Sequence, residues 1–111
     1  MVVKFEISTY QLLLLSDPSR TNLVGYIYFN DKSGKYIGLA AIMKDSSPLP
    51  ANAQYPNGLL AIYFHESELV SLLDTLRNEK PIFVQFHTDL KWGSVGTDLE
   101  PVGEQEAPKA A

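Results

Sequence analysis

Two histidines are the residues best suited to chemistry in this 111-residue chain. His65 and His87 each follow a run of apolar residues typical of a β-strand. If those strands are parallel neighbours, both imidazoles lie at strand carboxyl ends, where open sheets place ligands. With Glu66, Glu68 or Asp89 they would then form a zinc or iron site. The sequence does not establish that strand order, so structural roles at a helix entry and a strand end are the favoured interpretation.

Other catalytic chemistry has little support in the sequence. The chain has no cysteine, which excludes thiolate nucleophiles, disulfides and thiolate metal sites. It also has no Gly-x-Ser-x-Gly motif. The segment 93–96, Gly-Ser-Val-Gly, reads as a strand rather than as a loop before a helix, which argues against a phosphate cradle. We therefore predict a protein that is not an enzyme and that needs no cofactor.

The second set of chemically interesting residues is aromatic and basic. Aromatic side chains on a sheet, with lysines in the adjoining turns, are how proteins hold single-stranded nucleic acids. Tyrosine also has a high propensity for β-strands and is common on faces that pack in a dimer. For each individual tyrosine, this structural role is the favoured interpretation. The candidate binding residues occupy two regions of predicted strand and turn: Tyr26, Tyr28, Lys32, Lys35, Tyr36, Lys91 and Trp92.

One amphipathic helix is predicted between residues 65 and 81. Its apolar stripe has the i, i+3, i+4, i+7 spacing of a helix face, and it consists of Leu69, Leu72, Leu73 and Leu76. Pro81 supplies the stop. Apolar runs at 59–64 and 82–86 predict a strand on each side, and 92–97 predicts a last strand.

The N-terminal residues predict strands as well. Val3, Phe5 and Ile7 alternate with polar residues, and the apolar run 12–15 follows. We expect either one long strand with a bend near residues 9–11 or two short strands in sequence. Turn-forming residues dominate 16–21.

A β-hairpin is predicted from strands 23–29 and 36–43. Gly34 suits the left-handed position of a three-residue loop that closes on Asp31 opposite Lys35. The expected register on one face pairs residues as follows: Phe29 with Ile37, Ile27 with Leu39, Gly25 with Ala41, and Leu23 with Met43. The other face would then carry Val24, Tyr26 and Tyr28 beside Tyr36, Gly38, Ala40 and Ile42.

This second face is aromatic and aliphatic, which is unusual for the solvent side of an antiparallel sheet. A helix of about 12 residues is about 18 Å long and cannot cover both faces of the sheet. We expect a second copy of the chain to cover the tyrosines, with a bound ligand as the alternative. The proline-containing connection 45–57 is long for a loop, and it is either functional or a crossover.

Together these patterns predict an α+β fold. We expect a curved, mostly antiparallel sheet of about four strands, then one amphipathic helix, then a C-terminal strand pair, assembled as a homodimer. Residues 1–103 would form one domain and residues 104–111 a disordered acidic tail. The net charge is −4, but residues 1–97 carry nine acids and eight bases, or −1. The longest apolar run is far short of the roughly 20 residues that span a bilayer, so we expect no membrane contact and a cytoplasmic protein.

The order of the expected elements resembles a known class of domain. Strands, a proline-containing loop, another strand and an amphipathic helix over residues 3–78 resemble the whirly and positive-coactivator type of single-stranded DNA-binding domains. The resemblance lies in element order and not in a motif. It implies a curved four-stranded sheet, a helix that packs between the subunits of a dimer, and single-stranded DNA as a partner. The near-neutral charge of residues 1–97 departs from the basic surface of those families.

Overall fold

The computed structural model describes residues 1–99. The chain forms an α+β fold with one main helix, as predicted. The elements follow in this order: β1 Val2–Ile7, β2 Thr9–Leu14, β3 Leu23–Asn30, β4 Tyr36–Met43, β5 Ala53–Gln54, β6 Leu60–His65, the 3₁₀ helix η1 Glu66–Glu68, α1 Leu69–Asn78, β7 Ile82–His87 and β8 Gly93–Thr97. The tail predicted at 104–111 lies outside the described residues.

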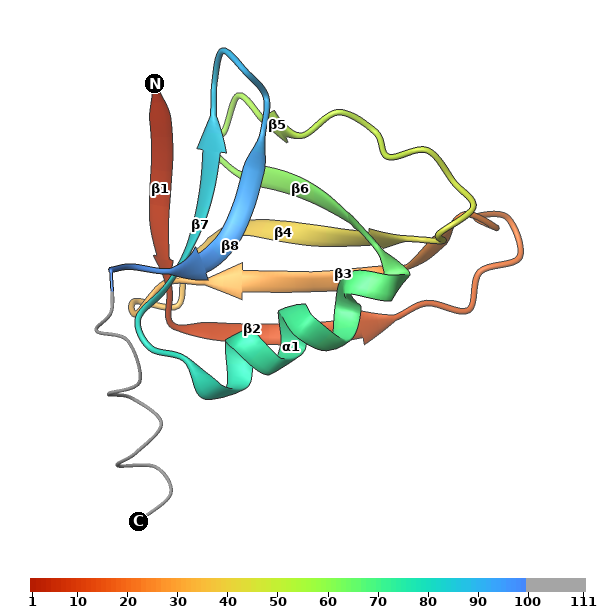
Figure 1. The fold of residues 1–111 in the computed structure, drawn as a ribbon, viewed down its shortest axis with the longest axis horizontal. Helices are drawn as coiled ribbons and strands as arrows, with labels where there is room; N and C mark the ends of the chain where they lie inside the picture. Colours follow the sequence, from red (N-terminus) through yellow and green to blue (C-terminus); the bar gives the residue numbers. More distant parts are fainter. Residues whose placement is uncertain (100–111) are drawn as a thin grey trace.

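The strands form two sheets, so the prediction of a single curved sheet is wrong. The larger sheet has the order β2-β3-β4-β6-β5, and its β4–β6 pair is parallel. The smaller is antiparallel, with the order β1-β7-β8. Strands of the two sheets cross each other in Figure 1. The C-terminal strand pair thus takes β1 as its third strand, because the chain bends away from the larger sheet between β1 and β2.

The bend lies at Ser8. Its backbone N–H donates to the carbonyl oxygen of Asn30 at 2.8 Å, which fixes the corner against the end of β3. The alternative of two short strands is therefore confirmed. The alternation predicted for β1 is also confirmed, because Val3, Phe5 and Ile7 turn toward the core and Ile7 is buried.

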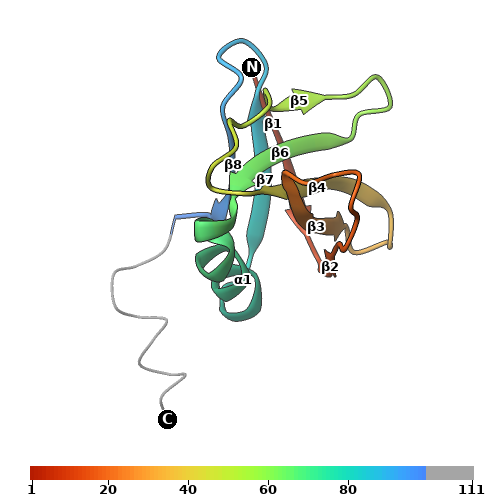
Figure 2. The same ribbon diagram turned by 90° about the vertical axis from the view of Figure 1, so that its right-hand side faces the viewer.

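A single core fills the space between the two sheets and the helix. The buried side chains come from the larger sheet, the helix and the smaller sheet, and they include Ile27, Phe29, Ile42, Leu60, Ile62, Leu72, Leu76, Val84 and Phe86. In Figure 2 the helix and the smaller sheet lie on one side of the larger sheet. The predicted leucine stripe of α1 is confirmed, since Leu69 and Leu73 pack against the same cluster.

The ends of the helical segment are set by local hydrogen bonds. The backbone N–H of His65 donates to the Glu68 carboxylate at 3.0 Å, as expected for a helix-entry residue. At the other end the N–H of Glu79 donates to the carbonyl of Thr75, just before Pro81. Among residues 1–99 no helix has the length and apolar character needed to cross a membrane.

The β3–β4 turn forms as predicted. Gly34 has a φ of 86°, and the N–H of Asp31 donates to the carbonyl of Lys35 at 2.9 Å. The Asp31 carboxylate accepts hydrogen bonds from the Ser33 hydroxyl and from the backbone N–H of Lys35, which lowers the pKa of Asp31.

The register predicted beyond this turn is wrong by one residue. Phe29 lies opposite Gly38, Ile27 opposite Ala40, and Gly25 opposite Ile42, whereas Leu23 does face Met43. The reason is a pair of irregularities, one next to the turn and one between Leu23 and Gly25, which shift the central pairs and then restore the register. Gly38, Ala40 and Ile42 therefore lie on the core face. Leu39 and Ala41, expected on the core face, lie instead opposite Tyr28 and Tyr26 on the other face.

Candidate functional site

Five tyrosines gather on the face of the larger sheet that points away from the core. We call this surface, formed by Tyr26, Tyr28, Tyr36, Tyr55 and Tyr63, the tyrosine face. Two of them come from β3, one from the start of β4 and one from β6, while Tyr55 follows β5. No helix or strand of residues 1–99 lies on this side of the sheet in Figure 2. The structure thus unites the three tyrosines predicted from the hairpin and adds two more.

The rings form a connected layer. The ring centroids of Tyr26 and Tyr28 are 5.7 Å apart, and those of Tyr28 and Tyr36 are 5.8 Å apart. Both separations lie in the range of favourable aromatic pairs. Tyr55 lies close enough to Tyr36 and Tyr63 to influence the ionisation of both. Contacts among these rings therefore stabilise the arrangement of the tyrosine face.

Small residues from the central strands form the floor under these rings. Ala41 lies opposite Tyr26 on one side and Tyr63 on the other, so the three share one row across the sheet. In the next row Leu39 lies between Tyr28 and Ala61. Ala41 is 2% exposed and Ala61 is fully buried, although no helix or strand of residues 1–99 lies over this face.

The environment of two tyrosines favours their neutral form. Burial raises the pKa of Tyr36, with smaller contributions from Tyr28, Tyr55 and Tyr26. Burial likewise raises the pKa of Tyr63, helped by Tyr55, which also hydrogen-bonds to its hydroxyl. The hydroxyls of Tyr36 and Tyr63 thus favour the neutral form, which both donates and accepts hydrogen bonds.

One end of the tyrosine face is hollowed. A cavity of about 400 Å³ lies between the 19–23 segment and the ends of β3, β4 and β6, lined in part by Arg20, Tyr26, Met43, Pro50 and Tyr63. A guanidinium N–H of Arg20 donates to the hydroxyl of Tyr26 at 3.3 Å. Its Nε also lies 3.6 Å from the Asp17 carboxylate, an exposed pair. The charged Arg20–Asp17 pair therefore lies at this edge of the tyrosine face.

The two predicted lysines of the β3–β4 turn have different surroundings. Lys35 precedes Tyr36, and both line a small cavity of about 60 Å³ with Gly58. Lys32 instead lines a separate cavity of about 270 Å³ that includes Lys4 of β1 but not Tyr36, although Phe5 lines both cavities. Of the two, we assign only Lys35 to the border of the tyrosine face.

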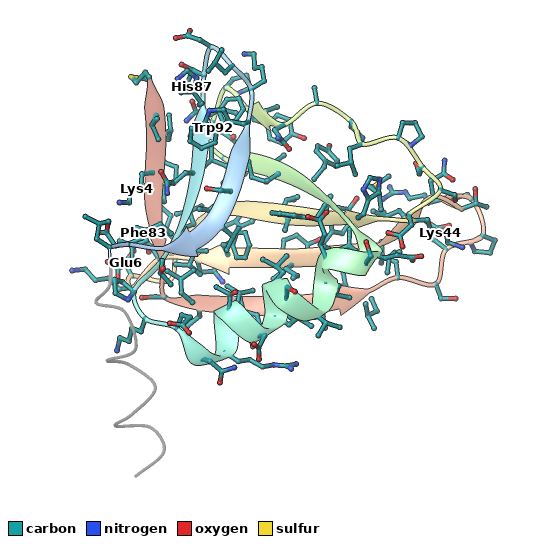
Figure 3. The ribbon with its side chains drawn as sticks, viewed as in Figure 1. Lys4, Glu6, Lys44, Phe83, His87 and Trp92 are labelled. Atoms are coloured by element: carbon teal, nitrogen blue, oxygen red, sulfur yellow. The ribbon has the colours of Figure 1, made fainter. Side chains whose placement is uncertain are left out.

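Lys91 and Trp92 belong to the smaller sheet and are not part of the tyrosine face. They form the turn between β7 and β8, where Trp92 stacks against His87 with ring centroids 5.5 Å apart. Figure 3 shows His87 and Trp92 together there, and Lys44 at a distant end of the molecule. The Lys91 ammonium lies 5.6 Å from the centroid of the Phe86 ring. Trp92 is 42% exposed, so the turn remains a separate accessible surface.

The proposed meeting of His65 and His87 does not occur. The strands that carry them, β6 and β7, lie in different sheets, so the parallel pair on which the metal hypothesis depended is absent. The Nε2 of His65 lies 2.8 Å from the Ser47 carbonyl oxygen, and the Nδ1 of His87 accepts the Leu90 N–H at 2.9 Å. Within residues 1–99 no group of three or more metal-ligating side chains comes together.

Sequence reasoning missed three contributors to the tyrosine face. Tyr63 and Arg20 are not among the predicted binding residues, because nothing in the sequence places them beside Tyr26. Tyr55 lies in the long 45–57 connection, where the pattern predicts neither strand nor face. The only available signal was that successive side chains of any strand point to opposite faces, which puts Tyr63 on the other face from the buried Ile62. The parallel β4–β6 pairing then brings Tyr63 to Ala41.

Comparisons of the chain with protein-family models, with curated proteins and with solved structures found no match.

Proposed function

We propose that the protein is a non-enzymatic, homodimeric binding module that holds its ligand on the tyrosine face. The observation that carries the proposal is a layer of five tyrosines on a sheet whose other face is already covered by a helix and a second sheet. Contiguous apolar and aromatic surface of this kind marks interaction sites in soluble proteins.

The chemistry of the face suits binding more than catalysis. Tyrosine offers a large, rigid contact area and has only two side-chain torsions. Fixing its side chain when a ligand binds therefore costs little conformational entropy. The neutral hydroxyls of Tyr36 and Tyr63 supply hydrogen bonds without charge. Both histidines make hydrogen bonds to the backbone and lie away from each other, which supports a structural role for them.

A second candidate gives the ligand a specific class, a single-stranded nucleic acid. Arg20 stands beside Tyr26 at one border of the face, and Lys35 precedes Tyr36 at another. Stacked bases on the rings, with phosphates on these cations, would use both features. The predicted resemblance to single-stranded DNA-binding domains points the same way, whereas the near-neutral charge of residues 1–97 weakens this candidate.

Amide NMR spectra test both candidates with two probes. Small planar heteroaromatic fragments test for a binding surface of any kind, and a twelve-nucleotide oligothymidylate tests for nucleic acid. We expect fragment-induced shifts to gather in β3, β4 and β6. If the nucleic-acid candidate is right, oligothymidylate shifts the same amides and its affinity falls as salt rises.

Two matched variants locate the binding surface. Tyr55 and Trp92 are 45% and 42% exposed, and they lie on the tyrosine face and on the β7–β8 turn. Tyr55→Ala should weaken fragment binding about tenfold or more, as base or ring stacking on one aromatic implies, and Trp92→Ala should leave it unchanged. Fragment shifts confined to the β7–β8 turn would overturn the proposal. Absence of oligothymidylate binding at low salt would remove the second candidate alone.

A further inference from the structure

We infer that two copies of the chain associate through β2, edge to edge and antiparallel, so that two larger sheets join into one. The inference rests on the homodimer proposed above and names the surface that makes it. It leaves the tyrosine face open in both copies.

The outer backbone N–H and C=O groups of β2 are available to pair with a further strand. β2 is an edge strand of the larger sheet and has no neighbour on its outer side among residues 1–99. The N–H of Leu15 donates to Val24, and in an antiparallel pair such inward groups alternate along the strand. The N–H and C=O groups of Tyr10, Leu12 and Leu14 therefore point outward, where a further strand could pair all of them.

The side chains of β2 also favour a partner. The strand contains neither a charged residue nor a proline. Leu13 is 38% exposed and Leu14 is 62% exposed, so the edge strand presents apolar side-chain surface to solvent. Soluble proteins normally protect such edges with charge, proline, bulges or short length, because unprotected edges pair with other chains.

The remaining sheet edges are protected in these ways or are weakened by glycine. β1 presents Lys4 and Glu6, and β8 contains Gly93 and Gly96, which weaken a strand. β5 has only two residues and lies between the prolines at 50 and 56. Among the four edges of the two sheets, β2 alone is long, apolar and unprotected.

A second copy fits this edge by symmetry. Antiparallel pairing about a two-fold axis at Leu12 places each Leu12 opposite its counterpart and each Tyr10 opposite Leu14 of the second copy. All three outward residues of each strand are then paired, and every side chain in those pairs is apolar or aromatic. Leu13 would lie opposite Gln11 of the second copy, on the side of the tyrosine face, since it pairs with Tyr26 in β3. The register therefore involves no like-charge contact.

Sedimentation equilibrium with Leu14→Lys tests the inference. The wild type should form a dimer, and the lysine should raise the dimer dissociation constant about 100-fold, since the dimer loses the burial of two leucine side chains. Val70→Lys is the matched control, because Val70 is also an exposed apolar residue, 77% exposed, but lies on α1. Its dissociation constant should equal that of the wild type.

Disulfide cross-linking tests the register without relying on a destabilising change. The natural chain has no cysteine. Gln11→Cys and Leu13→Cys chains mixed under oxidising conditions should cross-link to each other, since non-hydrogen-bonded partners have Cα atoms about 4.5 Å apart. Either variant alone should not, because like residues are offset by two positions along the strands, beyond the reach of about 7 Å.

The outcomes separate the inference from the proposed function. A wild type that stays monomeric at high concentration overturns both the dimer and the β2 interface, while fragment binding on the tyrosine face would stand. A dimer that survives Leu14→Lys, with no mixed cross-link, overturns the β2 interface alone. If the dimer survives Leu14→Lys, no mixed cross-link forms, and the amide signals of the tyrosine face shift on dimerisation, then the tyrosine face is the dimer contact.

Discussion

At the scale of single residues, Tyr36 and Tyr63 have the environments with the clearest measurable consequence. Both are half-buried among other tyrosines, so the folded protein favours their neutral hydroxyls. Below their ordinary pKa of 10.0 these hydroxyls are neutral in the folded and the unfolded chain alike, and they add no pH dependence. Above it the unfolded chain loses protons first, which favours unfolding.

The free energy of unfolding should therefore fall as the pH rises through about 10. Urea denaturation of the wild type from about pH 8 to about pH 11 measures this decline. In Tyr63→Phe the decline should be shallower, because one of the two shifted groups is gone. An equal slope in the two proteins would contradict the assignment of the shift to Tyr63.

Gly25 is a second residue whose role depends on its contact in the structure, and the hairpin pattern did not explain it. A Cβ atom on Gly25 would overlap the carbonyl oxygen of Leu13 in β2. The glycine therefore allows β2 to approach β3 closely at the irregularity after Leu23. The sequence placed Gly25 on the apolar face, but only the backbone contact with Leu13 explains why no side chain fits there.

At the scale of elements, the helix behaves as its sequence pattern predicts. Leu72 and Leu76 are buried, while Val70 on the opposite side is 77% exposed. The spacing of the four leucines was sufficient to predict this face, because helical periodicity depends only on local backbone geometry.

Leu72→Ala should lower the free energy of unfolding by about 2–5 kcal/mol, since it leaves a cavity between the helix and the sheets. Val70→Ala should change it by no more than about 0.5 kcal/mol. Urea denaturation of the two variants, with the slope of the transition checked against the wild type, measures both. Similar losses in the two variants would show that α1 does not bury the leucine stripe.

The β3–β4 hairpin marks the limit of such local reasoning. The turn residues Asp31 and Gly34 specify their own geometry, and the predicted turn formed. The register beyond it depended on whether Ile37 would join the ladder or bulge from it. Ile37 has no partner between the Asn30–Tyr36 and Phe29–Gly38 pairs, so it bulges from the ladder, and the turn residues alone do not specify this.

At the scale of the whole molecule, one core joins both sheets and the helix α1. Ile62 of the larger sheet contacts the backbone of Gly93 in the smaller one, and Ile82, Val84 and Phe86 lie in the same cluster as Ile27. Neither sheet has a separate core. The two sheets should therefore unfold together.

Trp92 fluorescence reports the β7–β8 turn, and tyrosine absorbance reports mainly the larger sheet, since that sheet and its loops carry all six tyrosines. We expect the two signals to give the same urea midpoint, because loss of either sheet exposes the shared core. Separate midpoints, with the smaller sheet melting first, would contradict a single cooperative unit.

The sequence by itself determined the features that depend on residues close together in the chain. These are the strand segments, the leucine face of α1, the Asp31–Gly34 turn, and the second, aromatic face at Tyr26, Tyr28 and Tyr36. These depend on local periodicity and turn chemistry. Only the tertiary structure decided that β1 leaves the larger sheet, that His65 and His87 lie in different sheets, and that Tyr55 and Tyr63 complete the tyrosine face. Each of these depends on which distant strands pair, and that choice is made by burial of the shared core, which no local pattern encodes.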